Sequence, residues 1–268
     1  MQLTNWYQIR PRNAPGVVLA VDFMSGRDEP DLAQFTDRLA LPYTTLGTLA
    51  PEAVPHGDPT AYVNCWHSEI VANQLQVHAV LGHCASASFA IALTARLTAD
   101  ASAAGTAPPL ALLLNPEAVN LRMFHWQFVW AIEPFVSYLP EMTIEKAHDI
   151  ARRCAESNGP DLGSVGLVLC REFRALISPA FHALDLDETA TDEMCERFES
   201  YMSYLTAAWR LSSCASSVNL AMFLTTDHDA PDGLAGDMQI FDVPAAELLV
   251  STGVASAAEK VMRLDQGL

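Results

Sequence analysis

Short apolar runs alternate with amphipathic segments along most of the chain. Each run is rich in aliphatic or β-branched residues, a pattern that predicts a buried strand. The runs are 16–23, 43–46, 77–81, 110–114, 219–225 and 238–243. The segments 31–41, 84–99 and 254–264 carry apolar residues at helical spacing and predict helices. Because strands that alternate with helices are typical of a parallel sheet covered on both faces, the pattern predicts an α/β fold.

The interval from residue 116 to residue 217 breaks this alternation. It holds helical patterns, such as 194–211, and an aromatic stretch at 124–130. Because it lies between two predicted strands, we interpret it as a helical lid inserted into the α/β domain. The predicted domains are therefore a core made of 1–115 and 218–268 and a lid at 116–217.

The composition excludes several classes of protein. Half of the 268 residues are hydrophobic, which excludes a disordered chain. The formal net charge is −17, which disfavours binding to nucleic acid or to an anionic membrane, because both need clustered basic residues. No apolar run is long enough to cross a bilayer. The N-terminal residues lack the apolar core of a secretory signal, so we expect a cytoplasmic protein.

The six cysteines lack the paired spacing of zinc sites and disulfide frameworks, so we predict reduced thiols and no metal or cofactor. One of them, Cys84, has a distinctive context. It follows the predicted strand 77–81 through Gly82 and His83, and a predicted helix of small residues begins immediately after it. A helix N-terminus stabilises a thiolate, so Cys84 is a candidate nucleophile. The alternative is a small buried thiol between strand and helix.

This stretch resembles the nucleophile elbow of α/β-hydrolases, G-x-S-x-G, with Cys84 in place of the serine and Ser86 in place of the second glycine. The segment 16–41 looks like the first strand, turn and helix of type II thioesterases. The resemblance implies an α/β-hydrolase fold with an inserted helical lid. It also implies an oxyanion hole formed by backbone N–H groups at Met24, or the neighbouring Phe23, and at Ala85. Phe23 and His83 are candidates for the substrate site. The alternatives are packing at the strand end for Phe23 and Met24 and a structural role for His83, because neighbouring residues of a strand point to opposite faces.

A cysteine nucleophile in this fold is similar to the Dieckmann cyclases of tetramate and pyridone biosynthesis, which have a Cys-His-Asp triad. Such enzymes take an acyl chain from an acyl or peptidyl carrier protein and close a ring by forming a carbon–carbon bond. The resemblance therefore implies a carrier-protein partner and a cyclised product. By the same resemblance, an apolar acyl chain would contact lid aromatics, for which Phe124, Trp126 and Trp130 are the candidates; packing within the lid is the alternative.

Two positions depart from the family pattern. Asn115 stands where thioesterases of peptide synthetases have the triad acid, and no histidine follows the last predicted strand, where the family has its base. His228 and Asp229 follow the strand 219–225 and are the candidate replacements; a solvated loop histidine is the alternative. Hydrolysis needs a base that activates water, so a weakened base favours cyclisation or acyl transfer. An editing type II thioesterase and a non-catalytic binding protein remain as alternative functions.

Overall fold

The computed structural model describes residues 3–23, 30–51, 54–139, 143–159, 161–212 and 218–264. Two compact units make up the chain, and each is described here by itself. The α/β unit comprises Met1–Val54, Pro59–Ala118 and Leu211–Leu268. The helical unit comprises Pro55–Asp58 and Val119–Arg210.

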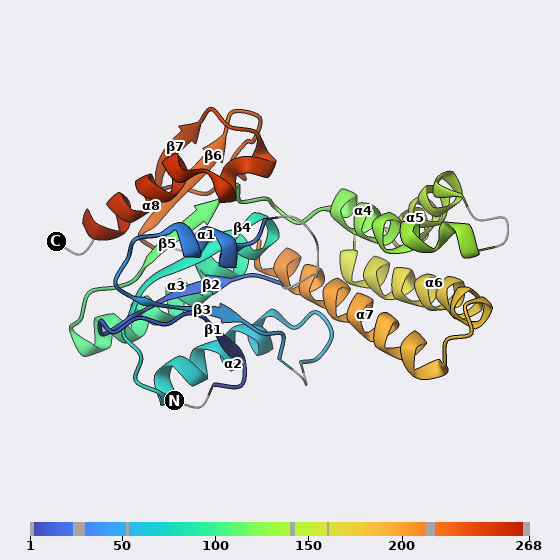
Figure 1. Ribbon diagram of the computed structural model, residues 1–268, viewed down its shortest axis with the longest axis horizontal. Coiled ribbons are helices and arrows are strands. Elements are labelled where there is room, and N and C mark those ends of the chain that lie inside the picture. Colours follow the sequence, from blue (N-terminus) through green and yellow to red (C-terminus); the bar gives the residue numbers. More distant parts are fainter. Residues whose placement is uncertain are drawn as a thin grey trace. The chain divides into compact units, whose positions relative to one another are not determined.

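A seven-stranded sheet forms the centre of the α/β unit (Figure 1). Its strands are β1 (Trp6–Arg10), β2 (Val17–Val21), β3 (Thr44–Thr48), β4 (Val77–His83), β5 (Leu110–Leu114), β6 (Leu220–Thr225) and β7 (Asp237–Phe241). They lie in the order β1-β3-β2-β4-β5-β6-β7. Only β1 is antiparallel among these strands. β2, β5 and β6 are buried along their whole length, as expected for apolar runs in a sheet covered on both faces.

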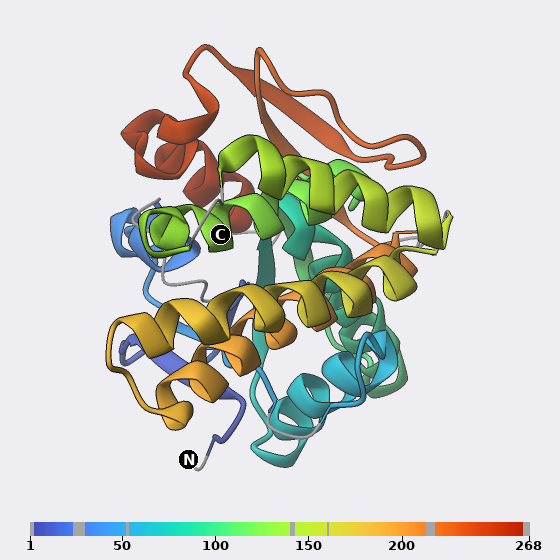
Figure 2. The ribbon, with the colours of Figure 1, turned by 90° about the vertical axis from the view of Figure 1, so that its right-hand side faces the viewer.

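Helices cover both faces of this sheet (Figures 1 and 2). They are α1 (Leu32–Arg38), α2 (Pro59–Ala72), α3 (Ala87–Ala104) and α8 (Thr252–Leu264), with the short 3-10 turns η1 (Cys84–Ser86) and η3 (Ala245–Val250). α1 and α8 share one core cluster with alternate residues of the central strands, including Leu81, Leu112 and Phe223. On the other face, Trp66 of α2 packs edge-on against Phe89 of α3.

The strand order reverses direction between β2 and β4. From β2 the chain crosses to β3 on one side, and it then returns to β4 on the other side of β2. In open α/β sheets, ligands bind outside the carboxyl ends of the strands at such a switch point. Because β2, β4, β5 and β6 are parallel, the residues that follow them lie along one edge of the sheet.

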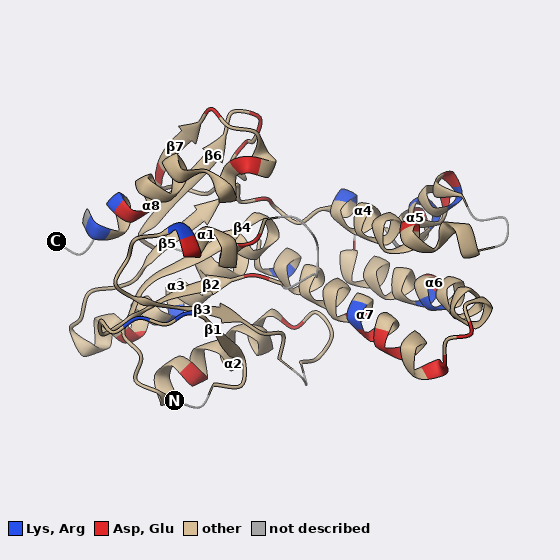
Figure 3. Ribbon diagram, in the orientation of Figure 1, with Lys and Arg blue, Asp and Glu red and all other residues tan. Residues whose placement is uncertain are grey.

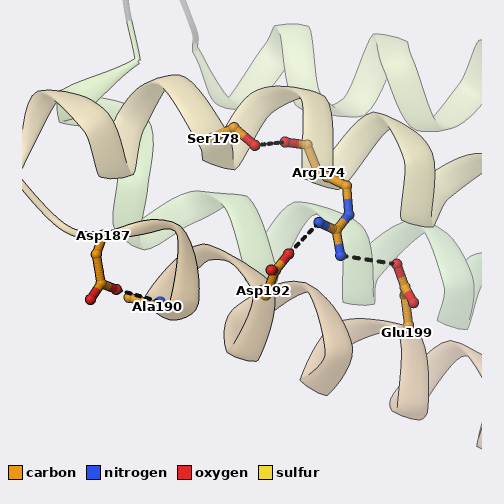
Figure 4. A network of polar contacts seen from close by, with 6 residues as sticks. All are labelled: Arg174, Ser178, Asp187, Ala190, Asp192 and Glu199. Carbon is orange, nitrogen blue, oxygen red and sulfur yellow. Dashed lines mark hydrogen bonds and ion pairs between the residues drawn. The ribbon is translucent and has the colours of Figure 1, made fainter.

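The helical unit consists of α4 (Leu121–Ile132), η2 (Glu133–Tyr138), α5 (Ile144–Asn158), α6 (Leu162–Ala183) and α7 (Glu188–Leu211). Its core includes Phe173 and Phe198, whose rings stack with centroids 4.3 Å apart. Polar contacts link α6 to α7 on the outside, where Arg174 binds Asp192 (2.6 Å) and Glu199 (3.9 Å) (Figure 4). Acidic residues line the first half of α7 (Figure 3). That this unit acts as a lid stays a prediction.

The α/β architecture predicted from the apolar runs is confirmed, and all six runs correspond to strands. The strand β1 was not predicted. Of its residues only Trp6 is buried, and it pairs only with β3, so it lacks the continuous apolar run of an inner strand. No helix in the described ranges is long and apolar enough to cross a membrane.

Candidate active site

The turn from β4 into α3 presents Cys84. β4 ends at His83, the 3-10 turn Cys84–Ser86 follows, and α3 begins at Ala87. Cys84 has a φ of +51°, in the left-handed region that residues other than glycine rarely adopt. Such a conformation costs about 1–3 kcal/mol and persists only where the surrounding structure enforces it. A strained residue between a strand and a helix is the geometry of a nucleophile elbow.

Two small residues enforce this turn. A Cβ at Gly82 would lie 2.7 Å from the Ala90 Cβ and 2.9 Å from the Ala87 Cα, so α3 crosses β4 too closely for any side chain there. The Ser86 hydroxyl accepts a hydrogen bond from the His83 N–H and donates one to the His83 carbonyl, both at 2.8 Å. Ser86 therefore stands at the position of the second glycine and braces the turn across Cys84.

Glu117 contacts the candidate nucleophile, and sequence reasoning missed it. The Cys84 thiol donates to the Glu117 Oε2 over 3.6 Å, and the Glu117 N–H donates to the Cys84 carbonyl over 3.2 Å. Glu117 follows β5 by three residues, and β5 pairs with β4 so that Leu114 lies opposite His83. The sequence held a signal for this contact, because Cys84 and Glu117 follow two predicted strands in succession. Residues that follow adjacent parallel strands meet at one edge of the sheet.

Asn115 joins two strand ends. It is buried and has a φ of +40°. Its Oδ1 accepts from the Thr225 N–H (2.9 Å), and its Nδ2 donates to the Thr225 Oγ1 (3.2 Å). Its own N–H donates to the Phe223 carbonyl (2.9 Å). The amide thus holds the end of β5 against the end of β6, and its catalytic assignment stays a prediction.

His228 follows β6 and contacts the segment that carries Glu117. Its Nε2 is 2.9 Å from the Pro116 carbonyl oxygen, and its N–H closes a turn onto the Thr225 carbonyl (3.1 Å). Because a carbonyl can only accept, the Nε2 carries the proton, and in the neutral ring Nδ1 is the acceptor. Asp229 is exposed. The catalytic roles assigned to His228 and Asp229 stay predictions.

His83 is held neutral. Burial lowers the pKa of His83 to about 4, and the nearby His228 adds a smaller effect of the same sign. Burial disfavours the charged imidazolium, and a second imidazolium beside it would repel the first. His83 therefore carries no charge at neutral pH, and its assignment to the substrate site stays a prediction.

The candidate oxyanion donors have different surroundings. Ala85 is buried in the first turn after Cys84, where backbone N–H groups have no partner within a helix. The Phe23 N–H, at the end of β2, donates to the Asp22 Oδ1 over 2.8 Å. Met24 lies outside the described residues. The oxyanion hole and the substrate role of Phe23 stay predictions.

The three aromatic candidates belong to the helical unit. Phe124 is fully buried, and a Cβ at Gly166 would lie 3.0 Å from its ring. Trp126 and Trp130 are 42% and 43% exposed, with ring centroids 5.9 Å apart. Phe124 is thus a core residue of its unit, while the two tryptophans present apolar surface. Their contact with substrate stays a prediction.

Metal-ligating side chains do not gather in the part of the chain that the structure describes. Across these residues, no group of three or more His, Cys, Asp or Glu side chains is placed to hold a metal ion.

Comparison with known proteins gives matches in structure alone. No family model matches the chain, and no curated protein matches it in sequence. It is similar to the Vlm2 thioesterase domain bound with a dodecadepsipeptide, with 16% identity, a TM-score of 0.52 and coverage of 97% of each chain. It is also similar to the NocB thioesterase domain in covalent complex with a fluorophosphonate nocardicin G analog, with 9% identity, a TM-score of 0.52 and coverage of 96% of this chain and 99% of that chain. With the observed strand order and elbow, these similarities show that the chain has the α/β-hydrolase fold, as the sequence predicted.

Proposed function

We propose that this protein is an enzyme that acts on an acyl thioester through the sulfur of Cys84. The observation that carries the proposal is the left-handed φ of Cys84 at a strand-to-helix turn, because this is the backbone conformation that a nucleophile elbow requires. The similarity to two thioesterase domains supports a thioester as the substrate class. An acyl or peptidyl carrier protein is the partner that would deliver it.

We further propose that the acyl group leaves as a ring. In the first step the Cys84 sulfur bonds to the thioester carbonyl carbon, and the carrier thiol leaves. In the second step an acidic carbon of the bound chain, between two carbonyl groups, gives its proton to water and attacks the acyl carbonyl. A carbon–carbon bond forms, the bond to Cys84 breaks, and the expelled Cys84 thiolate takes up a proton from water, which restores the thiol. This is a Dieckmann-type cyclisation.

The surroundings of Cys84 support cyclisation over hydrolysis. Hydrolysis requires a base positioned to activate a water molecule. The chain has no histidine beyond His228, so the position after the last strand, where thioesterases of this fold hold the histidine that activates water, has no such residue. Ring closure is less demanding, because a carbon between two carbonyl groups is already acidic and is held near the acyl group by its own chain.

Intact-protein mass spectrometry, with analysis of the released product, tests both the acylation of Cys84 and the cyclisation. With a β-ketoacyl-aminoacyl thioester of N-acetylcysteamine, we expect an adduct with the mass of the acyl group on the wild-type protein and on Cys65→Ala, a control at a partly exposed thiol of α2. Cys84→Ala should carry none. Absence of an adduct on the wild type would overturn the proposal. Release of the free acid without cyclic product would overturn cyclisation and identify a hydrolytic thioesterase.

A further inference from the structure

The three residues after β5 connect three strand ends of the α/β unit. Asn115 binds Thr225 at the end of β6, the Pro116 carbonyl accepts from His228, and Glu117 binds Cys84 at the end of β4. Glu117 makes two contacts with the same residue, one through its backbone N–H and one through its carboxylate. Its carboxylate is therefore held at the sulfur by the backbone of its own segment.

The direction of this contact follows from the chemistry of the two groups. An ionised carboxylate only accepts hydrogen bonds, so the thiol proton lies between Cys84 Sγ and Glu117 Oε2. The ring of His228 is anchored instead on the carbonyl of Pro116. Glu117 is thus a proton acceptor already in contact with the atom proposed to react.

We propose that Glu117 is a catalytic residue that takes the proton of Cys84 as the sulfur attacks the substrate; this inference rests on the proposed function. The bond from Sγ to hydrogen breaks, the proton passes to Oε2, and the sulfur electron pair forms the bond to the thioester carbon. When the tetrahedral intermediate collapses, the departing carrier thiolate takes the proton back. Glu117 then ends the step as a carboxylate.

This role makes a prediction that a structural role does not. Carboxyl groups are more acidic than thiols by about four pKa units when unperturbed, so the proton moves with the attack rather than before it. In the free enzyme the negative carboxylate disfavours a thiolate beside it. Removing the charge should therefore increase the reactivity of Cys84 towards a simple alkylating agent but reduce its acylation by a thioester.

The experiment compares Glu117→Gln with Glu117→Asp and with Asp232→Asn, a control at an exposed carboxylate of the same unit. The rate of Cys84 alkylation by iodoacetamide and the rate of acylation by the N-acetylcysteamine thioester are each measured from pH 5 to pH 9 by mass spectrometry. Among the described residues, His83 adjoins Cys84 in sequence and His228 contacts the residue before Glu117, and neither histidine is changed in these variants.

For Glu117→Gln we expect alkylation at neutral pH to rise about threefold to tenfold, because the loss of a like charge raises the thiolate fraction. Acylation should fall by about 100-fold, the usual contribution of a general base. Glu117→Asp should keep part of the acylation rate, and Asp232→Asn should match the wild type in both assays.

The outcomes separate the two proposals. Acylation of Glu117→Gln at the wild-type rate would overturn the role of Glu117 and leave the proposed function standing. Parallel losses in both assays would also overturn it, because they indicate a displaced Cys84. Failure of the wild type to acylate would overturn both, and the alkylation profiles would then still report whether the carboxylate contacts the thiol.

Discussion

The strand ends around Cys84 and the outer surface of α6 and α7 both contain several polar contacts, but they differ in burial. Asn115 and Thr225 are 4% and 1% exposed, and each satisfies the polar groups of the other. The side chains of Arg174 and Asp192 are 44% and 50% exposed. A buried polar group that loses its partner costs about 1–3 kcal/mol, whereas an exposed ion pair contributes about 0.2–1 kcal/mol.

The two regions differ in backbone conformation as well. Cys84 and Asn115 both have a positive φ, while Arg174 and Asp192 lie in regular helices. The strand ends therefore depend on contacts that offset local strain, and the helix pair does not. We expect substitutions at the strand ends to change stability and chemistry together, and substitutions on the helix surface to change little of either.

Gly82→Ala should have the largest effect. The new Cβ would meet the Cα of Ala87 at 2.9 Å, so α3 would have to move away from β4. We expect a loss of about 3 kcal/mol in the free energy of unfolding and a large loss of Cys84 acylation. Denaturant unfolding and the acylation assay measure the two effects.

The control for this variant is Gly253→Ala in α8, where the nearest atom to a new Cβ would be 3.7 Å away. That variant should be neutral or slightly stabilising, because alanine favours a helix over glycine. Equal unfolding free energies and equal acylation rates for Gly82→Ala and Gly253→Ala would contradict the close crossing of β4 by α3.

Asn115→Ala should have the next largest effect. It leaves the buried Thr225 N–H without its acceptor and places an alanine at a φ of +40°, so we expect a loss of about 2 kcal/mol. Asn115→Gly removes the same hydrogen bonds but tolerates the backbone, and should be less destabilised than Asn115→Ala. Unfolding midpoints of both variants decide how much of the loss comes from the backbone; a wild-type midpoint for Asn115→Ala would show that the Thr225 contact contributes nothing.

The elbow could be predicted from the sequence because all of its parts are local. Gly82, Cys84 and Ser86 follow an apolar run and precede a helix of small residues. The contact between Cys84 and Glu117 is different, since the two residues are 33 positions apart and Glu117 belongs to no pattern. The tie from Asn115 to Thr225 likewise depends on how β5 and β6 pair. Spacing along the chain fixes strands and turns, but contacts between strand ends follow from the register of the sheet.

His83 should make stability depend on pH. Its folded pKa of about 4 lies below the unfolded value of 6.5, so the unfolded chain binds more protons between these values. The contribution of the neutral His83 to the free energy of unfolding is complete above about pH 6.5 and is lost as the pH falls towards 4. Because the residue keeps some solvent contact, we expect about 1 kcal/mol rather than the full value of the shift. Urea unfolding at pH 7 and pH 4.5 should show a smaller difference for His83→Gln than for the wild type; an unchanged difference would contradict the prediction.

Arg174→Met should have the smallest effect, and it completes the comparison. The variant keeps most of the side-chain stem and removes the contacts with Asp192 and Glu199, so we expect a loss of about 0.5 kcal/mol. Salt screens exposed charges over about 3 Å at 1 M ionic strength, so the difference from the wild type should vanish there. Acylation of Cys84 should not change. A loss of unfolding free energy as large as that of Asn115→Ala, still present at 1 M salt, would contradict the comparison. It would show that the exposed contacts of Arg174 stabilise the protein as much as the buried contacts at the strand ends.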